Sequence, residues 1–221
     1  MPWAERAPAA IDSMPVPTTA KALLRMSWKK VKQNVYPELE LGVGALVGVF
    51  GGPGQGKSTY SCRLADGIPG PALLVSAEEG ASPSLSARLQ RANVKGDDFF
   101  VLPRASVDQV VAYAQRIRAE SLVIDSLQVA AWSPSDLRRV IELVSSLAAV
   151  VVVLQVNKQG LPAGANAVIH EVDVSIHVEA MSWRIAKSRY QDWSGGVGGD
   201  VLPASQETQR PYDTEREENN A

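Results

Sequence analysis

The chain has 221 residues, which is enough for one α/β domain with a full core and terminal tails. Its formal net charge of −2 favours no particular class of partner, so any contact with nucleic acid would need a local basic patch. Cys62 is the only cysteine, which excludes a disulfide framework and a cysteine-based zinc site within one chain.

Both ends of the chain have compositions that are typical of disorder. Residues 1–20 are rich in Ala and Pro and lack an apolar period, and residues 200–221 carry more acidic than basic side chains. We predict a disordered leader and a disordered acidic tail. The first 17 residues lack the pattern of a secretion signal, and no apolar run reaches the roughly 18 residues that span a bilayer. We therefore expect a cytoplasmic protein without membrane contact.

A basic segment follows the leader. Residues 21–35 contain five lysines and arginines and no acidic residue. Apolar side chains in this segment fall at helical spacing, namely Leu24, Trp28, Val31 and Val35. We predict a basic arm or linker helix over residues 21–38. It is either a helix packed on its own domain or an arm that docks on a neighbouring subunit or on DNA.

Residues 39–199 form the predicted core of the protein. Short apolar segments alternate with amphipathic ones, which predicts an α/β fold with a mostly parallel sheet and helices on both faces. The predicted strands are residues 45–50, 72–76, 99–102, 122–125 and 149–155. The predicted helices are residues 57–66, 84–92, 107–120 and 135–148. A mobile loop at 157–167 then leads to a C-terminal β-hairpin with strands at 172–178 and 183–187.

A glycine-rich loop follows the first strand of this core. Residues 51–58 have the sequence Gly-Gly-Pro-Gly-Gln-Gly-Lys-Ser, which matches the P-loop pattern between a strand and a helix. Its backbone N–H groups and the N-terminus of the helix are suited to hold phosphates. We expect Lys57 to reach the β- and γ-phosphates of ATP and Ser58 to place its hydroxyl on Mg²⁺. The predicted ATP-binding residues are Gly51, Gly52, Pro53, Gly54, Gln55, Gly56, Lys57, Ser58 and Thr59.

Acidic residues follow two of the predicted strands. Asp125 ends one strand at the edge where open parallel sheets bind ligands, and we expect it to orient the magnesium ion as a Walker B carboxylate. Glu78 follows the strand after the P-loop helix and is our candidate for activating the attacking water. Glu79 is the competing candidate, and both glutamates could instead cap the next helix.

The order of these motifs resembles the RecA-type recombination ATPases, and specifically their RadA/Sms DNA-repair branch. The resemblance covers roughly residues 40–195. The matching segments are Val75-Ser76-Ala77-Glu78-Glu79, Val123-Ile124-Asp125-Ser126-Leu127-Gln128, Val156-Asn157-Lys158-Gln159-Gly160 with Ala163-Gly164, His170-Glu171-Val172-Asp173, and Lys187-Ser188-Arg189-Tyr190-Gln191. The four-cysteine zinc module and the protease-like domain of that branch are absent from this sequence, and Ser188 and Gln191 replace its Asn and Gly.

The resemblance implies further site residues and partners. Gln155 would sense the γ-phosphate and relay its presence to the loop at 157–167, which would contact single-stranded DNA. Lys187 and Arg189 alternate along a strand, so they point to the same side. The resemblance implies that they reach the ATP of a neighbouring subunit as an arginine finger does; the alternative is an exposed basic edge. It therefore implies a homo-oligomer, ring or filament, with ATP at the subunit interfaces.

The sequence thus favours a RecA-like P-loop NTPase that hydrolyses ATP with Mg²⁺ and acts on single-stranded DNA in recombination, repair or replication. One alternative is an ATP-dependent regulator or assembly scaffold with the same core and no DNA role. Another is a hexameric helicase core. Salt-sensitive binding to single strands would favour a role on DNA over the scaffold, and strand unwinding would identify the helicase.

Overall fold

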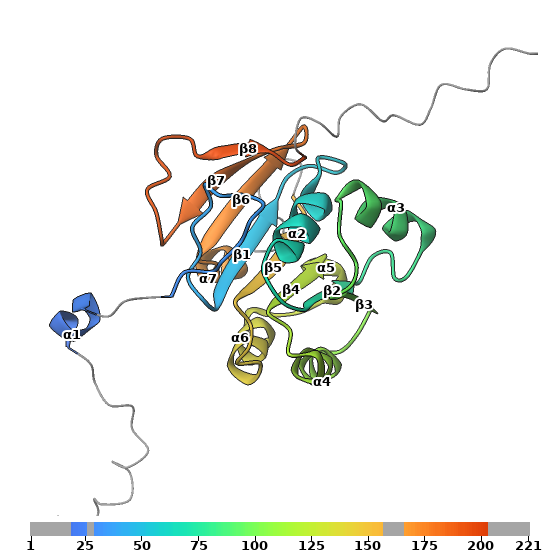
Figure 1. Ribbon diagram of the computed structural model, residues 1–221, viewed down its shortest axis with the longest axis horizontal. Helices are drawn as coiled ribbons and strands as arrows, with labels where there is room; N and C mark the ends of the chain where they lie inside the picture. The colour runs from blue at the N-terminus through green and yellow to red at the C-terminus, as the bar shows by residue number, and fades with distance from the viewer. Residues whose placement is uncertain (1–18, 26–28, 157–165, 203–221) are drawn as a thin grey trace, which may run out of the picture.

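An eight-stranded sheet forms the centre of the protein (Figure 1). The computed structural model describes residues 19–25, 29–156 and 166–202, and within these ranges the strand order is β3-β2-β4-β5-β1-β6-β7-β8. The strands are β1 (Ala45–Phe50), β2 (Ala72–Ser76), β3 (Phe99–Pro103), β4 (Ser121–Asp125), β5 (Ala149–Leu154), β6 (Val174–Glu179), β7 (Ser182–Ser188) and β8 (Gly198–Asp200). The first six strands in this order, from β3 at the edge to β6, are parallel to one another. Strands β7 and β8 extend the sheet beyond β6 with antiparallel pairing. The predicted parallel sheet and C-terminal hairpin are confirmed.

Helices cover both faces of this sheet (Figure 1). The helices that do so are α2 (Lys57–Asp66), α3 (Pro83–Arg91), α4 (Val107–Ile117), α5 (Leu127–Ala130), α6 (Pro134–Leu143) and α7 (Asn166–Glu171), whereas α1 (Ala20–Arg25) lies apart from the sheet in Figure 1. Helices α2 and α3 bury side chains in a core on one face, whereas α4, α6 and α7 contribute to a core on the other. Alternate residues of β5 enter the two cores, with Val151 in the first and Val152 in the second. Because both faces are covered, β5 is apolar along its whole length.

Two helices are shorter than the sequence predicted. Helix α4 ends at Ile117, because Arg118 adopts a left-handed conformation with φ of 52°. Helix α6 ends at Leu143 rather than residue 148, and the hydroxyl of Ser146 donates a hydrogen bond of 2.7 Å to the carbonyl oxygen of Ala119. Val144, immediately after α6, also leaves the helical conformation, with φ of −110° and ψ of 81°. The apolar pattern overestimated both helices because it continues past the residues at which the backbone turns.

The N-terminal basic segment, which we predicted as a basic arm or linker helix over residues 21–38, is not one continuous helix in the described residues. Helix α1 covers only Ala20–Arg25, and residues 29–31 instead pair with residues 41–43, with the backbone nitrogen of Val31 2.9 Å from the carbonyl oxygen of Leu41. The side chain of Gln33 accepts hydrogen bonds from the backbone between these two stretches and stabilises the turn. Contacts with residues 41–43 therefore determine the backbone conformation of residues 29–31, although the apolar side chains of the segment have helical spacing.

Residues 29–44 pack on the domain that they precede. The ring of Tyr36 stacks on Tyr60 of α2 at 4.5 Å and meets Trp183 of β7 edge-on at 5.2 Å. Its hydroxyl donates a hydrogen bond of 3.1 Å to the carbonyl oxygen of Val201. The side-chain oxygen of Gln191 accepts a bond of 2.6 Å from the backbone nitrogen of Glu40. This N-terminal segment thus joins α2 to the C-terminal hairpin.

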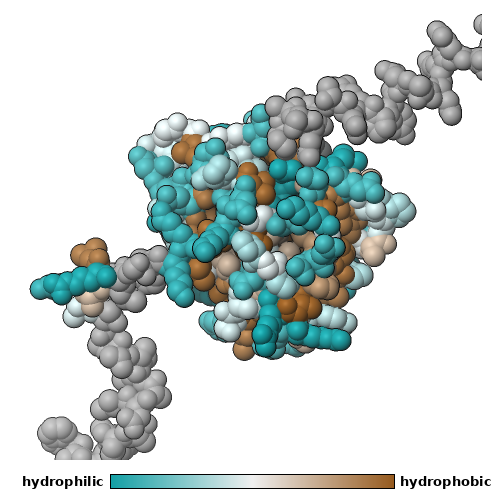
Figure 2. Space-filling view, viewed as in Figure 1, coloured by the Kyte–Doolittle hydropathy of each residue, from teal (hydrophilic) through white to brown (hydrophobic). Residues whose placement is uncertain are grey.

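Most of the surface in view is hydrophilic, with hydrophobic side chains scattered over it (Figure 2). Large exposed hydrophobic side chains include Leu24 on α1, Phe100 on the edge strand β3, and Trp193 between β7 and β8. In the part of the chain that the structure describes, no helix has both the length and the apolar character needed to cross a membrane. Most of the predicted leader, loop and tail lies outside the described residues, over 1–18, 157–165 and 203–221. Where they are described, these predictions are too long, because α1 begins at Ala20, α7 begins at Asn166 and β8 extends to Asp200.

Candidate active site

The P-loop connects the end of β1 to the start of α2, as the sequence predicted. Gly56, immediately before α2, has a φ of 104°, a conformation that favours glycine. A Cβ atom on Gly51 would lie 2.0 Å from the carbonyl oxygen of Val178 in β6, so a larger residue does not fit there. Lys57 and Ser58 begin α2, and the N-terminus of this helix is suited to bind an anion.

The tip of the β6–β7 hairpin holds the P-loop from one side. The backbone nitrogen of Ala180 donates to the side-chain oxygen of Gln55 at 2.5 Å, and that of Met181 donates to the carbonyl oxygen of Gln55 at 3.2 Å. The Met181 sulfur lies 2.6 Å from the position that a Cβ on Gly56 would take. Gln55 was predicted only as part of the ATP-binding loop, and the structure adds that it joins this loop to the hairpin.

A cavity of about 400 Å³ opens beside the P-loop. Eight of the residues predicted from the sequence line it: Gly51, Pro53 and Gly54 of the loop, and the polar residues Lys57, Ser58, Glu78, Asp125 and Gln155. Lys57 and Ser58 come from the start of α2. Glu78, Asp125 and Gln155 lie at or just after the ends of β2, β4 and β5, which are adjacent strands of the sheet. The carboxyl ends of parallel strands meet at one edge, which brings these distant residues together.

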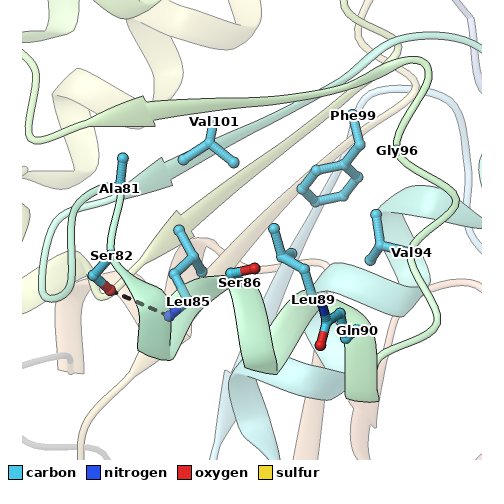
Figure 3. Close-up of a pocket in the computed structure, with 10 residues that line it drawn as sticks. All are labelled: Ala81, Ser82, Leu85, Ser86, Leu89, Gln90, Val94, Gly96, Phe99 and Val101. Carbon is cyan, nitrogen blue, oxygen red and sulfur yellow. Dashed lines mark hydrogen bonds between the residues drawn. The ribbon is translucent and has the colours of Figure 1, made fainter.

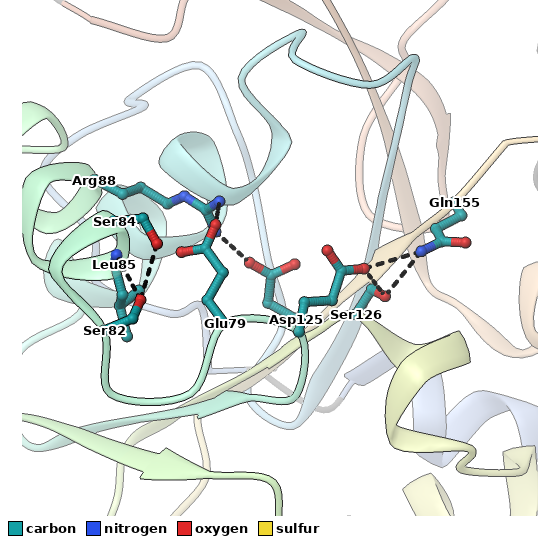
Figure 4. A network of polar contacts seen from close by, with 9 residues as sticks. Glu79, Ser82, Ser84, Leu85, Arg88, Asp125, Ser126 and Gln155 are labelled. Atoms are coloured by element: carbon teal, nitrogen blue, oxygen red, sulfur yellow. Dashed lines mark hydrogen bonds and ion pairs between the residues drawn. The ribbon is translucent and has the colours of Figure 1, made fainter.

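The two neighbouring glutamates have different partners. The Oε1 atom of Glu78 accepts hydrogen bonds from the Ser126 hydroxyl at 2.5 Å and from the Gln155 side-chain nitrogen at 2.9 Å. Glu79 forms an ion pair with Arg88 of α3 (Figure 4). Of the two glutamates, Glu78 lines the cavity beside the P-loop. This geometry favours Glu78 over Glu79 as the group that faces a phosphate-bound water.

Charges of opposite sign compensate one another in the cavity. The side chain of Asp125 is only 7% exposed, and burial raises the pKa of its carboxyl. A hydrogen bond from Ser58 and the charge of Arg88 oppose this rise. Burial lowers the pKa of Lys57, and the carboxylates of Asp125 and Glu78 oppose that change. The ammonium group of Lys57 donates a bond of 2.7 Å to the carbonyl oxygen of Gly52 within the loop.

The residues in this cavity fit a magnesium ion bound together with phosphates. The hydroxyl of Ser58 acts on the carboxylate of Asp125 and lowers its pKa, and both residues line the cavity, so two oxygen donors face the same space. Mg²⁺ prefers oxygen ligands, retains several waters and is commonly held by one or two protein groups plus substrate phosphates. The pair of Ser58 and Asp125 beside the P-loop has this character.

Lys187 and Arg189 contact α7 rather than this cavity. The ammonium group of Lys187 donates to the carbonyl oxygens of Ile169 at 3.1 Å and Val172 at 2.8 Å. Arg189 forms an ion pair of 2.9 Å with Asp173. Both cations therefore point to the same side and hold the C-terminal end of α7, where positive charge is favourable. Their reach to the ATP of a neighbouring subunit stays a prediction.

Two polar residues at the site were not identified from the sequence. Ser126 bonds to Glu78, and it directly follows Asp125, so its position beside a candidate metal ligand was a usable signal. Arg88 donates to Asp125 at 3.0 Å. It lies ten residues beyond Glu78 on a helix whose other charged residue, Arg91, is exposed, and no local pattern separates the two arginines.

Comparison with known proteins identifies relatives of the chain, although no family model matches it. The chain is 30% identical over 165 residues to the DNA repair protein RadA of Haemophilus influenzae, and 30% identical over 151 residues to that of Streptococcus pneumoniae. It is 28% identical over 218 residues to the DNA repair protein RadA of Halalkalibacterium halodurans. The chain has a RecA-like core homologous to that of RadA. The resemblance to the RadA/Sms branch is confirmed.

The alignments with RadA cover most of this chain and a minor part of the relatives. They include 67%, 62% and 76% of the chain, and 34%, 36% and 47% of the respective RadA proteins. The first two relatives are thus matched over about a third of their length. Among solved structures, the flagellar accessory protein FlaH of Methanocaldococcus jannaschii is similar over 67% of this chain and 83% of its own, with 14% identity and a TM-score of 0.49.

Proposed function

We propose that the protein binds ATP with Mg²⁺, hydrolyses it, and uses hydrolysis to act on single-stranded DNA. The observation that carries this proposal is the cavity in which Lys57, Ser58, Glu78, Asp125 and Gln155 meet beside the P-loop. A cation, a hydroxyl–carboxylate pair and a second carboxylate in one cavity are the groups that phosphoanhydride hydrolysis requires.

The position of each side chain supports a distinct role. The backbone of the P-loop and the N-terminus of α2 hold the phosphates, and Lys57 neutralises their charge. Magnesium, when bound at Ser58 and Asp125, supplies further neutralisation of the phosphate oxygens. Glu78 takes a proton from the attacking water. Gln155, whose amide nitrogen lies 2.9 Å from Glu78, holds that carboxylate in place and precedes the segment at 157–165.

Action on DNA is supported by the names of the relatives, which are DNA repair proteins matched over 67% and 76% of this chain. Assembly into a homo-oligomer is what the resemblance of the motifs to the RadA/Sms branch implies. We propose a ring or filament with ATP between subunits. In it, Lys187 and Arg189 would exchange contacts with α7 for contacts with a neighbour's phosphates.

The decisive experiment compares ATP hydrolysis by the wild type and Lys57→Ala, with Lys95→Ala as the control for loss of an exposed lysine outside the site. We expect loss of turnover and weaker ATP binding in Lys57→Ala only. A folded Lys57→Ala protein that hydrolyses ATP at the wild-type rate would refute the proposal.

The same assay with single-stranded DNA tests the partner. Stimulation that weakens with salt supports DNA as the substrate of the motor. Hydrolysis that is indifferent to DNA supports the regulator or scaffold, and unwinding of a forked duplex supports the helicase. Oligomer size, measured by light scattering with and without nucleotide, accompanies each assay.

A further inference from the structure

Arg88 lies on α3, a helix that is anchored by its own cap and by packing. The hydroxyl of Ser82 accepts a hydrogen bond of 3.2 Å from the backbone nitrogen of Leu85 at the helix start. Leu85 and Leu89 point into a cavity of about 320 Å³ between α3 and β3 (Figure 3). Leu85 is only 3% exposed. The apolar side of the helix is therefore held by the core, and Arg88 extends to the cavity beside the P-loop.

The guanidinium group of Arg88 joins two carboxylates. One terminal nitrogen lies 3.0 Å from the Oδ2 atom of Asp125, and the other pairs with Oε1 of Glu79 (Figure 4). The exposed fractions of the Arg88, Asp125 and Glu79 side chains are 21%, 7% and 24%. A planar guanidinium presents several donors at fixed angles, so it can bridge two carboxylates where an ammonium group acts as a point charge.

The carboxylate that Arg88 holds is also the candidate magnesium ligand. Oδ2 of Asp125 accepts from Arg88, and Asp125 lines the same cavity as Ser58. Two cations that share one nearly buried carboxylate repel each other strongly, because water screens them little. The guanidinium has room to leave, since Arg88 also lines a second cavity of about 280 Å³ that shares Lys57 and Ser58 with the first. Arg88 and a divalent cation are therefore alternative partners of Asp125.

We propose that Arg88 is an internal counter-ion that competes with the divalent cation for Asp125. The inference rests on the proposed function, because it takes Ser58 and Asp125 as the metal site. Arg88 is thus a positioning residue: its bond of 3.0 Å holds Asp125 in place before the metal arrives, and its charge lowers the affinity for metal alone. The protein would then bind metal poorly until a nucleotide brings it.

The test is binding of Mn²⁺ alone, without nucleotide, followed by the loss of the free Mn²⁺ signal in electron paramagnetic resonance. Arg88→Gln removes the competing charge, and we expect it to bind Mn²⁺ about tenfold more tightly than the wild type, a typical size for coupling between two ligands. Arg91→Gln is the matched control, because this exposed arginine lines the second cavity without contacting Asp125. We expect no such gain from it.

Two further variants keep the test decisive. Adding Asp125→Asn to Arg88→Gln should abolish the gain, because Asp125 is the shared partner. Arg88→Lys keeps one charge but loses the bridge, so its Mn²⁺ affinity should lie between those of wild type and Arg88→Gln; it carries the test if Arg88→Gln does not fold.

The proposal is overturned if Arg88→Gln, or Arg88→Lys in its place, binds Mn²⁺ no more tightly than the wild type. It is also overturned if Arg91→Gln gains as much, or if the gain survives Asp125→Asn. Binding of a fluorescent ATP analogue to the wild type is measured in parallel. If the wild type does not bind the ATP analogue, the proposed function is refuted. The Mn²⁺ comparison decides separately whether Arg88 and the metal compete for Asp125.

Discussion

Replacing Glu78 by Gln separates the chemistry of the site from its architecture. Glutamine retains a side-chain oxygen, so the hydrogen bonds that Ser126 and Gln155 donate at 2.5 and 2.9 Å can persist. What is lost is the base. General-base catalysis contributes about 10²- to 10⁴-fold, so we expect the hydrolysis rate to fall at least about a hundredfold. This corresponds to about 2.7 kcal/mol in activation free energy. ATP affinity should change little, because the phosphate-binding groups are intact.

Glu79→Gln is the matched control for this experiment. It removes the same charge from the adjacent residue, but the partner of Glu79 is Arg88. Single-turnover hydrolysis and equilibrium binding of a fluorescent ATP analogue measure rate and affinity separately. We expect a much smaller loss of rate in Glu79→Gln. Equal losses would indicate an effect of net charge rather than of a base, and a larger loss in Glu79→Gln would show that the wrong carboxylate was chosen.

Three further predictions concern the loop, the N-terminal segment and assembly. Gly56→Ala should weaken binding of the ATP analogue, because an L side chain is strained at the φ of 104° that this loop position adopts; wild-type affinity would contradict this. Tyr36→Phe should lower the free energy of unfolding in urea by about 1–3 kcal/mol, because the buried carbonyl of Val201 loses its donor; an unchanged midpoint would contradict it. Arg189→Ala and Lys57→Ala subunits, each inactive alone, should recover hydrolysis when mixed, because intact P-loops then face intact cations. Continued inactivity despite proven co-assembly would show that Arg189 acts only in holding α7.

The parts of the fold that the sequence predicted well are those set by local signals. Strand β5 is an uninterrupted apolar run because it is covered on both faces, and the P-loop glycines are required by backbone geometry at Gly51 and Gly56. Asp125 was identifiable because it interrupts an apolar strand at its carboxyl end. The topology of a parallel sheet then brings such strand-end residues to one edge without further information.

The parts that escaped prediction depend on contacts between distant segments. The bond of Arg88 to Asp125 spans 37 positions and follows from how α3 packs beside the sheet. Gln55 meets the hairpin tip across 125 positions. In the N-terminal segment, Val31 and Val35 had helical spacing, but their apolar side chains pack against the core from a non-helical backbone. Periodicity describes which side chains are buried and leaves open which partner buries them.

The packing of residues 29–44 on the C-terminal hairpin constrains how the chain can assemble during synthesis. Tyr36 and Glu40 leave the ribosome early, yet their partners Val201 and Gln191 follow 165 and 151 positions later, respectively. Strand β1 likewise lies between β5 and β6, which are made after it. Until the hairpin emerges, the aromatic ring of Tyr36 lacks part of the surface that buries it. The two ends of the domain therefore complete their packing together, late in synthesis. In a nascent chain that stops before β7, residues 29–44 still lack their partners in the C-terminal hairpin.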